Sequence, residues 1–297
     1  MAKRTKKIQD YDWLYSFLRN YTDLALKLSY RTIKYVGRER IPQDGAVIYA
    51  PNHTNALMDA MVILAMDRKP KVFVARADIF RNPKIAKILT FLKILPIMRM
   101  RDGMDEVRKN NETIEKAVDV LRDRVPFCIF PEGTHQTKYS SLPLSKGIFR
   151  IAFQAQELMP DMPLYIVPVG LRYGNFFRFR STVTLQVGNP INVGEFIAKN
   201  EDKTPQELMN LMRGCLDERM KETILYIPND EEYDAKNEIC AAVSDKLLKE
   251  HKPCGNDPLV TANQEAARRI EEMKSEKPEA AARLIASADE AVKMRRK

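Results

Sequence analysis

The chain has 297 residues, of which 44% are hydrophobic and 30% are charged, and its formal net charge is +9. This composition is that of a globular protein and excludes wholesale disorder and a fibrous repeat. The charge divides into +13 over residues 1–199 and −4 over residues 200–297. A basic body of this kind attracts polyanions, so phosphates, anionic lipid headgroups and nucleic acid are all candidate ligands.

The spacing of the cysteines and the hydropathy of the chain indicate where in the cell the protein is expected. The four cysteines are far apart and form no Cys-x-x-Cys pair, which argues against a zinc site and a disulfide framework and favours a reducing cytoplasm. The basic N-terminus is not followed by the apolar segment of roughly 7–15 residues that a signal peptide requires. Lys87 and Lys93 interrupt the most apolar stretch, so no run approaches the roughly 20 residues that span a bilayer. We therefore expect a cytoplasmic protein, peripherally associated with the inner face of the membrane.

Residues 11–36 place apolar side chains at three- and four-residue spacings with charged residues between them, which is the pattern of an amphipathic helix. Such a helix could pack on the core or lie on lipid, and both can hold for different faces. Because residues 1–40 are also rich in Lys and Arg, we interpret them as an N-terminal membrane-docking segment. A second basic amphipathic stretch carries Lys84, Lys87 and Lys93. We interpret it as a second membrane-docking stretch, with a helix that faces the core as the alternative.

From residue 41 the chain alternates short apolar runs with helical patterns. Strands are expected at residues 46–50, 72–75, 127–130, 165–171 and 182–187, and helices at residues 56–66, 83–94, 104–123 and 147–158. This alternation predicts an α/β fold over residues 41–200, with a mixed, mostly parallel sheet flanked by helices. Residues 201–297 are predicted to form a helical C-terminal region whose role the sequence does not indicate.

A polar turn follows the first of these strands. His53 lies in this turn, at the carboxyl edge where open α/β sheets form ligand crevices. A histidine there can take a proton from a hydroxyl group, and a carboxylate on its other ring nitrogen would orient the ring and stabilise its positive charge. Asp59 is the nearest candidate for that carboxylate. Because residues six apart do not share a helix face, His53 should precede the helix and Asp59 should lie in its early turns.

Three further motifs lie near strand ends. Residues 130–135, Phe-Pro-Glu-Gly-Thr-His, place Glu132 at the same edge, beside a glycine that allows a ligand to approach the backbone. Arg99 and Arg101 follow a short apolar strand and could clamp a phosphate bidentately. Pro168, in an Ile-Val-Pro-Val-Gly run, limits hydrogen bonding and suggests a strand end that lines a cleft.

In their order these motifs resemble those of the glycerol-3-phosphate and 1-acylglycerol-3-phosphate acyltransferases. That family shares a His–Asp block, an arginine block, a Phe-Pro-Glu-Gly block and a Val-Pro block, and all four are present between residues 52 and 170. The resemblance extends over residues 30–200. It implies transfer of an acyl group from acyl-CoA or acyl carrier protein to a hydroxyl of a glycerol phosphate or lysophosphatidate in phospholipid synthesis. Beyond the thioester donor we expect no cofactor and no metal.

The resemblance also implies roles for individual residues. His53 would deprotonate the acceptor hydroxyl, which attacks the thioester directly, and Asp59 would orient the ring, so that no covalent enzyme intermediate is needed. Backbone amides that the sequence does not identify would stabilise the oxyanion. The residues expected to bind substrate are Arg99, Arg101, Glu132, Gly133, Thr134 and Lys146.

The His–Asp block departs from the usual pattern of the family, because five residues rather than four separate His53 from Asp59. An extra residue can be absorbed in the turn before the helix. A similar longer spacing occurs in fungal-type glycerol-3-phosphate/dihydroxyacetone-phosphate acyltransferases, which the surroundings of Pro96 and Gly133 also resemble. The spacing therefore favours glycerol 3-phosphate as the acceptor.

Other classes of function compete with this interpretation. A metal-dependent hydrolase could use His53, Asp59, Glu132 and His135, but the ligand spacing that such sites normally show is missing. A nucleic-acid binder would explain the basic charge, but no aromatic stacking motif or recognition helix accompanies it. An acyltransferase for another lysolipid or an amino-lipid is a closer alternative. As partners we expect an acyl thioester donor, a glycerol phosphate or lysophospholipid acceptor and an anionic membrane surface, and no nucleic acid.

Overall fold

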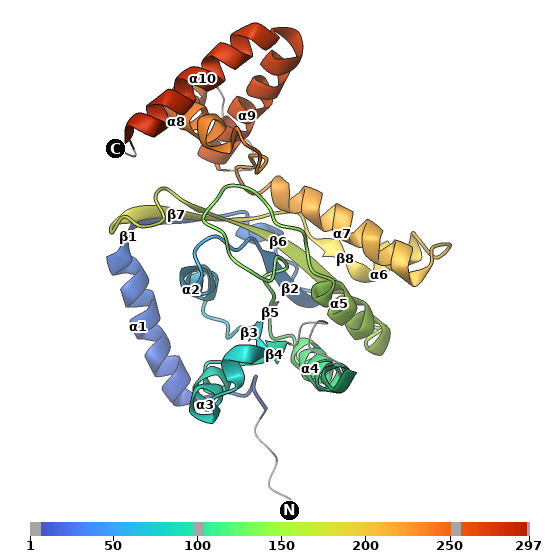
Figure 1. Cartoon of the computed structure of the whole chain (residues 1–297). Helices are drawn as coiled ribbons and strands as arrows, with labels where there is room; N and C mark the ends of the chain where they lie inside the picture. Colours follow the sequence, from blue (N-terminus) through green and yellow to red (C-terminus); the bar gives the residue numbers. More distant parts are fainter. Residues whose placement is uncertain (1–6, 98–103, 251–256, 296–297) are drawn as a thin grey trace, which may run out of the picture.

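One mixed sheet organises the fold. The computed structural model describes residues 7–97, 104–250 and 257–295, and in them eight strands form one sheet in the order β1-β7-β6-β2-β5-β3-β4, with β8 beside β6 (Figure 1). The strands are β1 Tyr30–Val36, β2 Ala46–Pro51, β3 Val72–Arg76, β4 Ile94–Ile97, β5 Phe127–Cys128, β6 Leu164–Tyr173, β7 Ser181–Val187 and β8 Ile191–Asn192. β6 is antiparallel to β7 and β8, whereas the other pairs are parallel. The predicted mixed, mostly parallel sheet is therefore confirmed.

Helices cover both faces of the sheet (Figure 1). Their bounds are α1 Trp13–Ser29, α2 Leu57–Ala65, α3 Pro83–Phe91, α4 Met104–Arg122, α5 Gly147–Leu158, α6 Val193–Ala198, α7 Pro205–Lys221, α8 Tyr233–Glu250, α9 Pro258–Glu276 and α10 Pro278–Arg295, with short 3₁₀ turns at Arg38–Arg40 and Ala77–Phe80. Because side chains alternate along a strand, Ile48 of β2 joins the apolar cluster of α4, α5 and α7, whereas its neighbour Tyr49 joins that of α1 and α2. β2, which ends just before His53, is thus held between two apolar layers.

The N-terminal helix is shorter than the sequence predicts. α1 ends at Ser29, and residues 30–36 form β1, an edge strand that pairs in parallel with β7. The helical prediction is wrong for these residues because the apolar spacing continues into a segment whose aromatic and β-branched residues, such as Tyr30 and Val36, suit a strand. The N-terminal segment is therefore joined to the sheet by its own strand.

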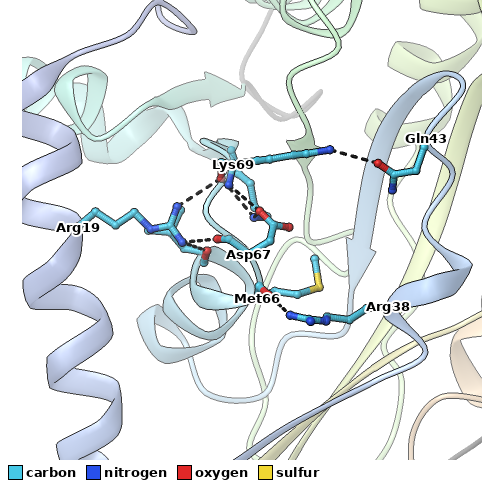
Figure 2. A network of polar contacts seen from close by, with 8 residues as sticks. Arg19, Arg38, Gln43, Met66, Asp67 and Lys69 are labelled. Atoms are coloured by element: carbon cyan, nitrogen blue, oxygen red, sulfur yellow. Dashed lines mark hydrogen bonds and ion pairs between the residues drawn. The ribbon is translucent and has the colours of Figure 1, made fainter.

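α1 turns most of its apolar side chains outward. Arg19 is buried, and Figure 2 shows why: its guanidinium donates hydrogen bonds to backbone oxygens at the C-terminal end of α2, including that of Asp67 at 2.6 Å. Arg38 donates to the backbone oxygen of Met66 nearby, at 2.7 Å. These cations satisfy carbonyls that the end of a helix leaves unpaired. The exposed large apolar residues of α1 are Trp13, Leu14, Phe17, Leu18, Tyr21, Leu24 and Leu28.

The second basic stretch also differs from its prediction, because α3 is shorter than the helix expected there. Lys93 adopts a left-handed φ of 61° at the turn into β4. Its buried Nζ donates hydrogen bonds to the backbone oxygens of Ile8 at 2.6 Å and Asp10 at 2.8 Å. Lys93 therefore holds the N-terminal segment and does not face outward, whereas Lys84 and Lys87 are exposed.

The sequence suggested that Pro168 lies at a strand end. In the structure Pro168 lies in the middle of β6 instead. On one side β6 pairs with β2 along Leu164–Val169. On the other side the partner changes from β8, at Ile166, to β7, at Val169. The backbone oxygen of Pro168 accepts from Gly188 at 2.9 Å on that second side. Its missing N–H falls in the gap between two partners, so the proline removes no ladder hydrogen bond to β2.

The C-terminal region is helical, as predicted. α7 packs on the sheet, whereas α8, α9 and α10 bury their apolar residues in a cluster of their own. Tyr139, from the loop of residues 130–146, packs against that cluster. In the described ranges no helix combines the length and the apolar character needed to cross a bilayer.

Candidate active site

A side chain fixes the point where the chain leaves β2. Asn52 is buried, and its Nδ2 donates to the backbone oxygen of Leu171 in β6 at 3.1 Å, while its Oδ1 accepts from the backbone N–H of Leu171 at 2.6 Å. These two bonds extend the pairing of β2 with β6 by one residue and hold the backbone next to His53. Sequence reasoning assigned no role to Asn52, although its place between a strand and a histidine was a usable signal.

His53 and Asp59 form a hydrogen-bonded pair at this edge. Nδ1 of His53 lies 2.8 Å from Oδ2 of Asp59, which is fully buried in the first turn of α2. The backbone amides of Thr54 and Asn55 donate to the same oxygen at 2.9 and 2.7 Å. Because an ionised carboxylate only accepts, the geometry assigns the proton to Nδ1 and leaves Nε2 as an acceptor. The structure places the histidine before the helix and the aspartate within it, as the spacing predicts.

Tyr173 completes the surroundings of Asp59. Its hydroxyl, at the end of β6, donates to Oδ1 of Asp59 at 2.7 Å, and its side chain is fully buried. Burial, followed by the nearby negative charge of Asp59, raises the pKa of Tyr173 well above its ordinary value, so the hydroxyl keeps its proton and remains a donor. Both oxygens of Asp59 are thus occupied. Sequence reasoning missed Tyr173 because 114 residues separate the two partners.

Glu132 is a second buried carboxyl group beside His53. Both of its oxygens are buried without a hydrogen-bond partner of ordinary geometry among the described residues. Burial raises the pKa of Glu132 to about 8, although the backbone amides of His53 and Leu142 act in the opposite direction. Phe130, two residues earlier, stacks on the His53 ring with the centroids 4.1 Å apart. The Phe-Pro-Glu-Gly motif therefore lies against the histidine, as predicted from their shared sheet edge.

The residues after Glu132 form the exposed part of the same loop. Gly133 has a φ of 65°, which a glycine adopts without strain, and its N–H donates to the backbone oxygen of Phe130 at 3.1 Å. Thr134 and His135 are exposed, and the ring of His135 lies edge-on to His53 at 5.6 Å between centroids. Gly133 and Thr134 thus lie in the exposed part of the loop, next to the residue whose ring contacts His53.

The loop is fastened at Tyr139, which the sequence did not single out. The Tyr139 hydroxyl donates to the backbone oxygen of Tyr173 at 2.5 Å. Its amide donates to the hydroxyl of Tyr233 in α8 at 2.6 Å, and its backbone oxygen accepts from the amide of Ile227 at 2.7 Å. Residues 130–146 are therefore tied both to the end of β6 and to the C-terminal region.

The remaining predicted substrate-binding residues are not brought to His53 by any described contact. Lys146 is exposed just before α5, and its Nζ donates to Oε1 of Gln206 in α7 at 3.4 Å. Arg99 and Arg101 lie outside the described residues. The described part of the site is therefore the dyad of His53 and Asp59, with Tyr173, and the loop that carries Glu132.

This arrangement suits general-base chemistry. The His53 side chain is 18% exposed, and the fully buried Asp59 holds Nδ1, so Nε2 is the ring nitrogen left for a substrate. A buried carboxylate in that position orients the ring and stabilises the imidazolium that forms on proton uptake. Among the described residues no three His, Cys, Asp or Glu side chains gather as metal ligands.

Comparison with known proteins finds similarity to acyltransferases. The family model described as Acyltransferase matches residues 32–172. A Saccharomyces cerevisiae protein named glycerol-3-phosphate O-acyltransferase 2 is 32% identical over 111 residues, which are 36% of this chain and 15% of that protein. A Borreliella burgdorferi 1-acyl-sn-glycerol-3-phosphate acyltransferase is 26% identical over 148 residues, 50% of this chain and 57% of that protein. The chain thus spans less than two thirds of the length of each of these two relatives.

A solved structure also aligns with much of this chain. The crystal structure of a 1-acyl-sn-glycerophosphate (LPA) acyltransferase from Thermotoga maritima aligns with a TM-score of 0.48 at 19% identity, over 70% of this chain and 79% of that one. The segment matched by the family model carries His53, Asp59, Glu132 and Tyr139, and it ends one residue before Tyr173. Residues 32–172 of this chain therefore resemble the acyltransferase family, by the match to the family model.

Proposed function

We propose that this chain transfers a fatty acyl group from an acyl thioester to a hydroxyl of a glycerol phosphate or lysophosphatidate. The observation that carries the proposal is the His53–Asp59 pair, in which a buried carboxylate with both oxygens hydrogen-bonded faces a partly exposed imidazole. The family match of the surrounding domain supports this chemistry over other uses of a His–Asp pair.

The proposed step needs no covalent enzyme intermediate. Nε2 of His53 takes the proton of the acceptor hydroxyl as the hydroxyl oxygen bonds to the thioester carbonyl carbon. The carbon–sulfur bond then breaks, and the imidazolium returns its proton to the departing thiolate, so that an ester and a free thiol are formed. Asp59 stabilises the imidazolium between these events through its 2.8 Å contact with Nδ1. A general base of this kind contributes about 10²–10⁴-fold to the rate.

Substrate contacts follow the predicted roles. Glu132, Gly133 and Thr134 would line the acceptor pocket, because their loop packs against the His53 ring through Phe130. Arg99 and Arg101 remain the proposed phosphate clamp, and Lys146 a further phosphate contact. The donor is acyl-CoA or acyl carrier protein, and no further cofactor is proposed.

Glycerol 3-phosphate is the proposed acceptor, with lysophosphatidate as its alternative. Of the residues between His53 and Asp59, Thr54 and Asn55 lie in the turn before α2, and their amides both donate to Asp59. The longer spacing therefore leaves the dyad intact and remains a marker of the fungal-type enzymes. The similarity to a yeast protein named as a glycerol-3-phosphate O-acyltransferase supports the same acceptor.

Peripheral attachment to the cytoplasmic face of a membrane is also proposed. The apolar residues of α1 are exposed, with Trp13 at 68% and Phe17 at 51%, and α3 exposes Ile85 and Ile88 beside Lys84. Apolar side chains interleaved with cations are typical of helices that lie in the lipid interface. Docking there would bring the active site to its acyl-chain substrates and products.

Activity measurements test the chemistry. The purified chain is assayed with acyl-CoA and with acyl carrier protein thioesters against glycerol 3-phosphate and lysophosphatidate. We expect His53→Ala to lower acyl transfer by about 10²–10⁴-fold, because it removes the base. His135→Ala is the matched control and should keep at least half of the activity, because His135 has no role in the proposed proton transfer. A metal site would need both histidines, so an equal loss in both variants would favour the metal-dependent alternative. A folded His53→Ala variant that keeps more than a tenth of wild-type transfer contradicts the assignment.

Vesicle sedimentation tests the attachment. We expect the double variant Trp13→Ser/Phe17→Ser to bind vesicles with anionic lipid at least tenfold more weakly than wild type, because each substitution removes an apolar anchor. The double variant Leu158→Ser/Leu211→Ser removes two exposed apolar residues from α5 and α7 and is the control. Equal loss in both variants contradicts docking through α1, and equal binding of wild type to neutral and anionic vesicles contradicts the electrostatic part.

A further inference from the structure

A cavity of about 630 Å³ lies between α1, β1 and the C-terminal end of α2. Tyr30 lines it on the side of the active site, where the Tyr30 and Tyr173 rings lie 5.8 Å apart. The charged lining residues are Asp23, Lys27, Arg31, Asp67, Arg68 and Arg180. Four cations thus face two carboxylates, and the cavity as a whole attracts anions.

The cations of this cavity are available to a ligand. The side chains of Lys27, Arg31, Arg68 and Arg180 have no hydrogen-bond or ion-pair partner in the ranges that the structure describes. Of the two carboxylates, Asp67 is occupied, because its Oδ1 accepts from Nζ of Lys71 at 2.8 Å and from the amide of Lys69 at 2.8 Å.

Asp23 is different, because its Oδ1 is buried without a described hydrogen-bond partner. A buried carboxylate oxygen that lacks a donor is costly, and a ligand that brings an O–H or N–H group would relieve that cost. The cavity therefore offers positive charge for one part of a ligand and an acceptor for another.

The end of α2 does not oppose an anion here. The C-terminal carbonyls of a helix carry partial negative charge. Arg19 and Arg38 cover the carbonyls of Asp67 and Met66, as Figure 2 shows, so these guanidinium groups offset that charge beside the cavity. The charged lining, with four cations and two carboxylates, therefore carries a net positive charge toward a ligand.

Exposed apolar residues flank the cavity on two elements. On α1, Leu24 and Leu28 are exposed on either side of Lys27 in the sequence. The loop after β6 exposes Phe177 and Phe179, and the next residue, Arg180, lines the cavity. This loop is tied to α1, because the amide of Arg180 donates to the backbone oxygen of Ser29 at 2.8 Å. Apolar side chains around a basic cavity match the layering of a membrane surface, with headgroups above acyl chains.

We propose that this cavity binds the headgroup of a glycerophospholipid while α1 lies on the bilayer. The phosphate meets the cations contributed by α1, β1, the segment after α2 and the loop after β6, and a hydroxyl or ammonium group of the headgroup donates to Asp23. Phosphatidylglycerol has both features, whereas phosphatidylcholine has no O–H or N–H donor. The inference rests on the proposed membrane docking and adds a specific lipid site to it.

Vesicle binding by the full chain tests the site. Vesicles of phosphatidylcholine with and without phosphatidylglycerol are titrated against wild type, Arg31→Glu/Arg68→Glu and the control Lys84→Glu/Lys87→Glu. The two double variants change the net charge equally, and the control changes exposed cations of α3 outside the cavity. We expect the cavity variant to bind phosphatidylglycerol vesicles about tenfold more weakly than the control variant. Equal loss in both variants overturns the site in favour of diffuse attraction.

Soluble probes separate a lipid headgroup from a free anion. Monomeric dihexanoyl phosphatidylglycerol should raise the Tm of wild type by a few degrees and leave that of Arg31→Glu/Arg68→Glu unchanged, because ligand binding stabilises the folded state. A shift of the same size with inorganic phosphate at equal concentration overturns a headgroup site, because phosphate alone then accounts for binding. Failure of wild type to bind any vesicle overturns membrane docking itself, and failure of acyl transfer overturns only the proposed chemistry.

Discussion

Two regions that meet at His53 each bury a carboxyl group, and they treat it in opposite ways. In the turn of residues 52–59, Asp59 accepts four hydrogen bonds, from His53, Thr54, Asn55 and Tyr173. In the loop of residues 130–146, Glu132 has no described partner of ordinary geometry, and burial raises its pKa to about 8. Donors around one carboxyl group suit its ionised form, whereas burial favours the protonated form of the other.

The difference assigns different work to the two groups. Asp59, with donors on both oxygens, can balance the positive charge that His53 acquires when it takes a proton. Because burial raises the pKa of Glu132 to about 8, its protonated form is favoured at neutral pH, and this form can donate a hydrogen bond as well as accept one. The His53–Asp59 pair therefore needs only the negative charge of Asp59. A second negative charge, on Glu132, would repel the phosphate of the proposed acceptor.

Asp59→Asn should have the largest effect of the changes that break this contrast. The amide keeps the shape of the side chain but cannot balance an imidazolium, so we expect kcat to fall about 10²–10⁴-fold. The kcat of acyl transfer to glycerol 3-phosphate is compared between the variant and wild type. Asp44→Asn is the matched control, because Asp44 also accepts from a tyrosine hydroxyl, that of Tyr165 at 3.0 Å, but far along the sheet from His53. A folded Asp59→Asn variant within tenfold of wild type would show that the charge is not needed.

Glu132→Gln should change how stability depends on pH. Because the pKa of Glu132 in the folded chain, about 8, exceeds the value of about 4.3 expected for the unfolded chain, the folded state binds more protons between these values. Its contribution to stability is present in full below about pH 4.3 and is lost as the pH rises to about 8, a loss on the order of 3–5 kcal/mol. Urea unfolding at pH 5, 7 and 9 measures the free energy of unfolding.

The glutamine variant carries no proton to lose, so its free energy of unfolding should fall less between pH 5 and pH 9 than that of wild type. Glu195→Gln, at an exposed position of α6, is the control and should follow the wild-type slope. Parallel slopes for wild type and Glu132→Gln would mean that Glu132 is ionised in the folded chain throughout this range. The contrast with Asp59 would then disappear.

The residues of this contrast differ in how far the sequence could predict them. His53 and Asp59 were accessible because both lie within one strand–turn–helix segment, where local spacing determines their geometry. Glu132 was accessible because its motif follows a parallel strand, and carboxyl ends of neighbouring parallel strands share an edge. The buried strands could also be predicted, since strands covered on both faces appear in the sequence as continuous apolar runs. Local patterns were sufficient in each of these cases.

Partners distant in the chain were not accessible in this way. Tyr173 reaches Asp59 across 114 residues, and its position in β6 depends on the register of pairing with β2 and β7. β1 was predicted as helix because its spacing continues that of α1, and only the unpaired edge of β7 makes it a strand. The outward face of α1 likewise depends on Arg19, which turns inward to reach the end of α2. Tertiary partners decided these cases over local propensity.

Tyr173→Phe removes one of the four hydrogen bonds to Asp59 and should have an intermediate effect. A hydrogen bond to a charged group contributes roughly 1.5–3 kcal/mol, and the three remaining donors retain most of the geometry, so we expect kcat to fall about tenfold. The KM values for donor and acceptor should stay within about twofold, because among the described residues the hydroxyl donates its hydrogen bond to Asp59 and not to the loop of residues 130–146. Tyr165→Phe, which removes the bond to exposed Asp44, is the control. An unchanged kcat with a lowered Tm would reduce Tyr173 to a structural residue.

Tyr233→Phe should have the smallest effect and tests whether the C-terminal region supports the Glu132 side of the site. The substitution removes the acceptor for the Tyr139 amide, which is a 2.6 Å bond between α8 and the loop of residues 130–146. Two further bonds of Tyr139 remain, to Tyr173 and Ile227, so we expect acyl transfer to fall only two- to threefold, equivalent to less than about 1 kcal/mol. Amide exchange in residues 130–146 should rise several-fold, whereas exchange around Asp59 stays as in wild type. The control is Tyr226→Phe, whose ring contacts Lys221 instead of the loop. If exchange rises equally around Asp59 and around Glu132, the two regions respond as one unit, and their contrast lies in the carboxyl environments alone.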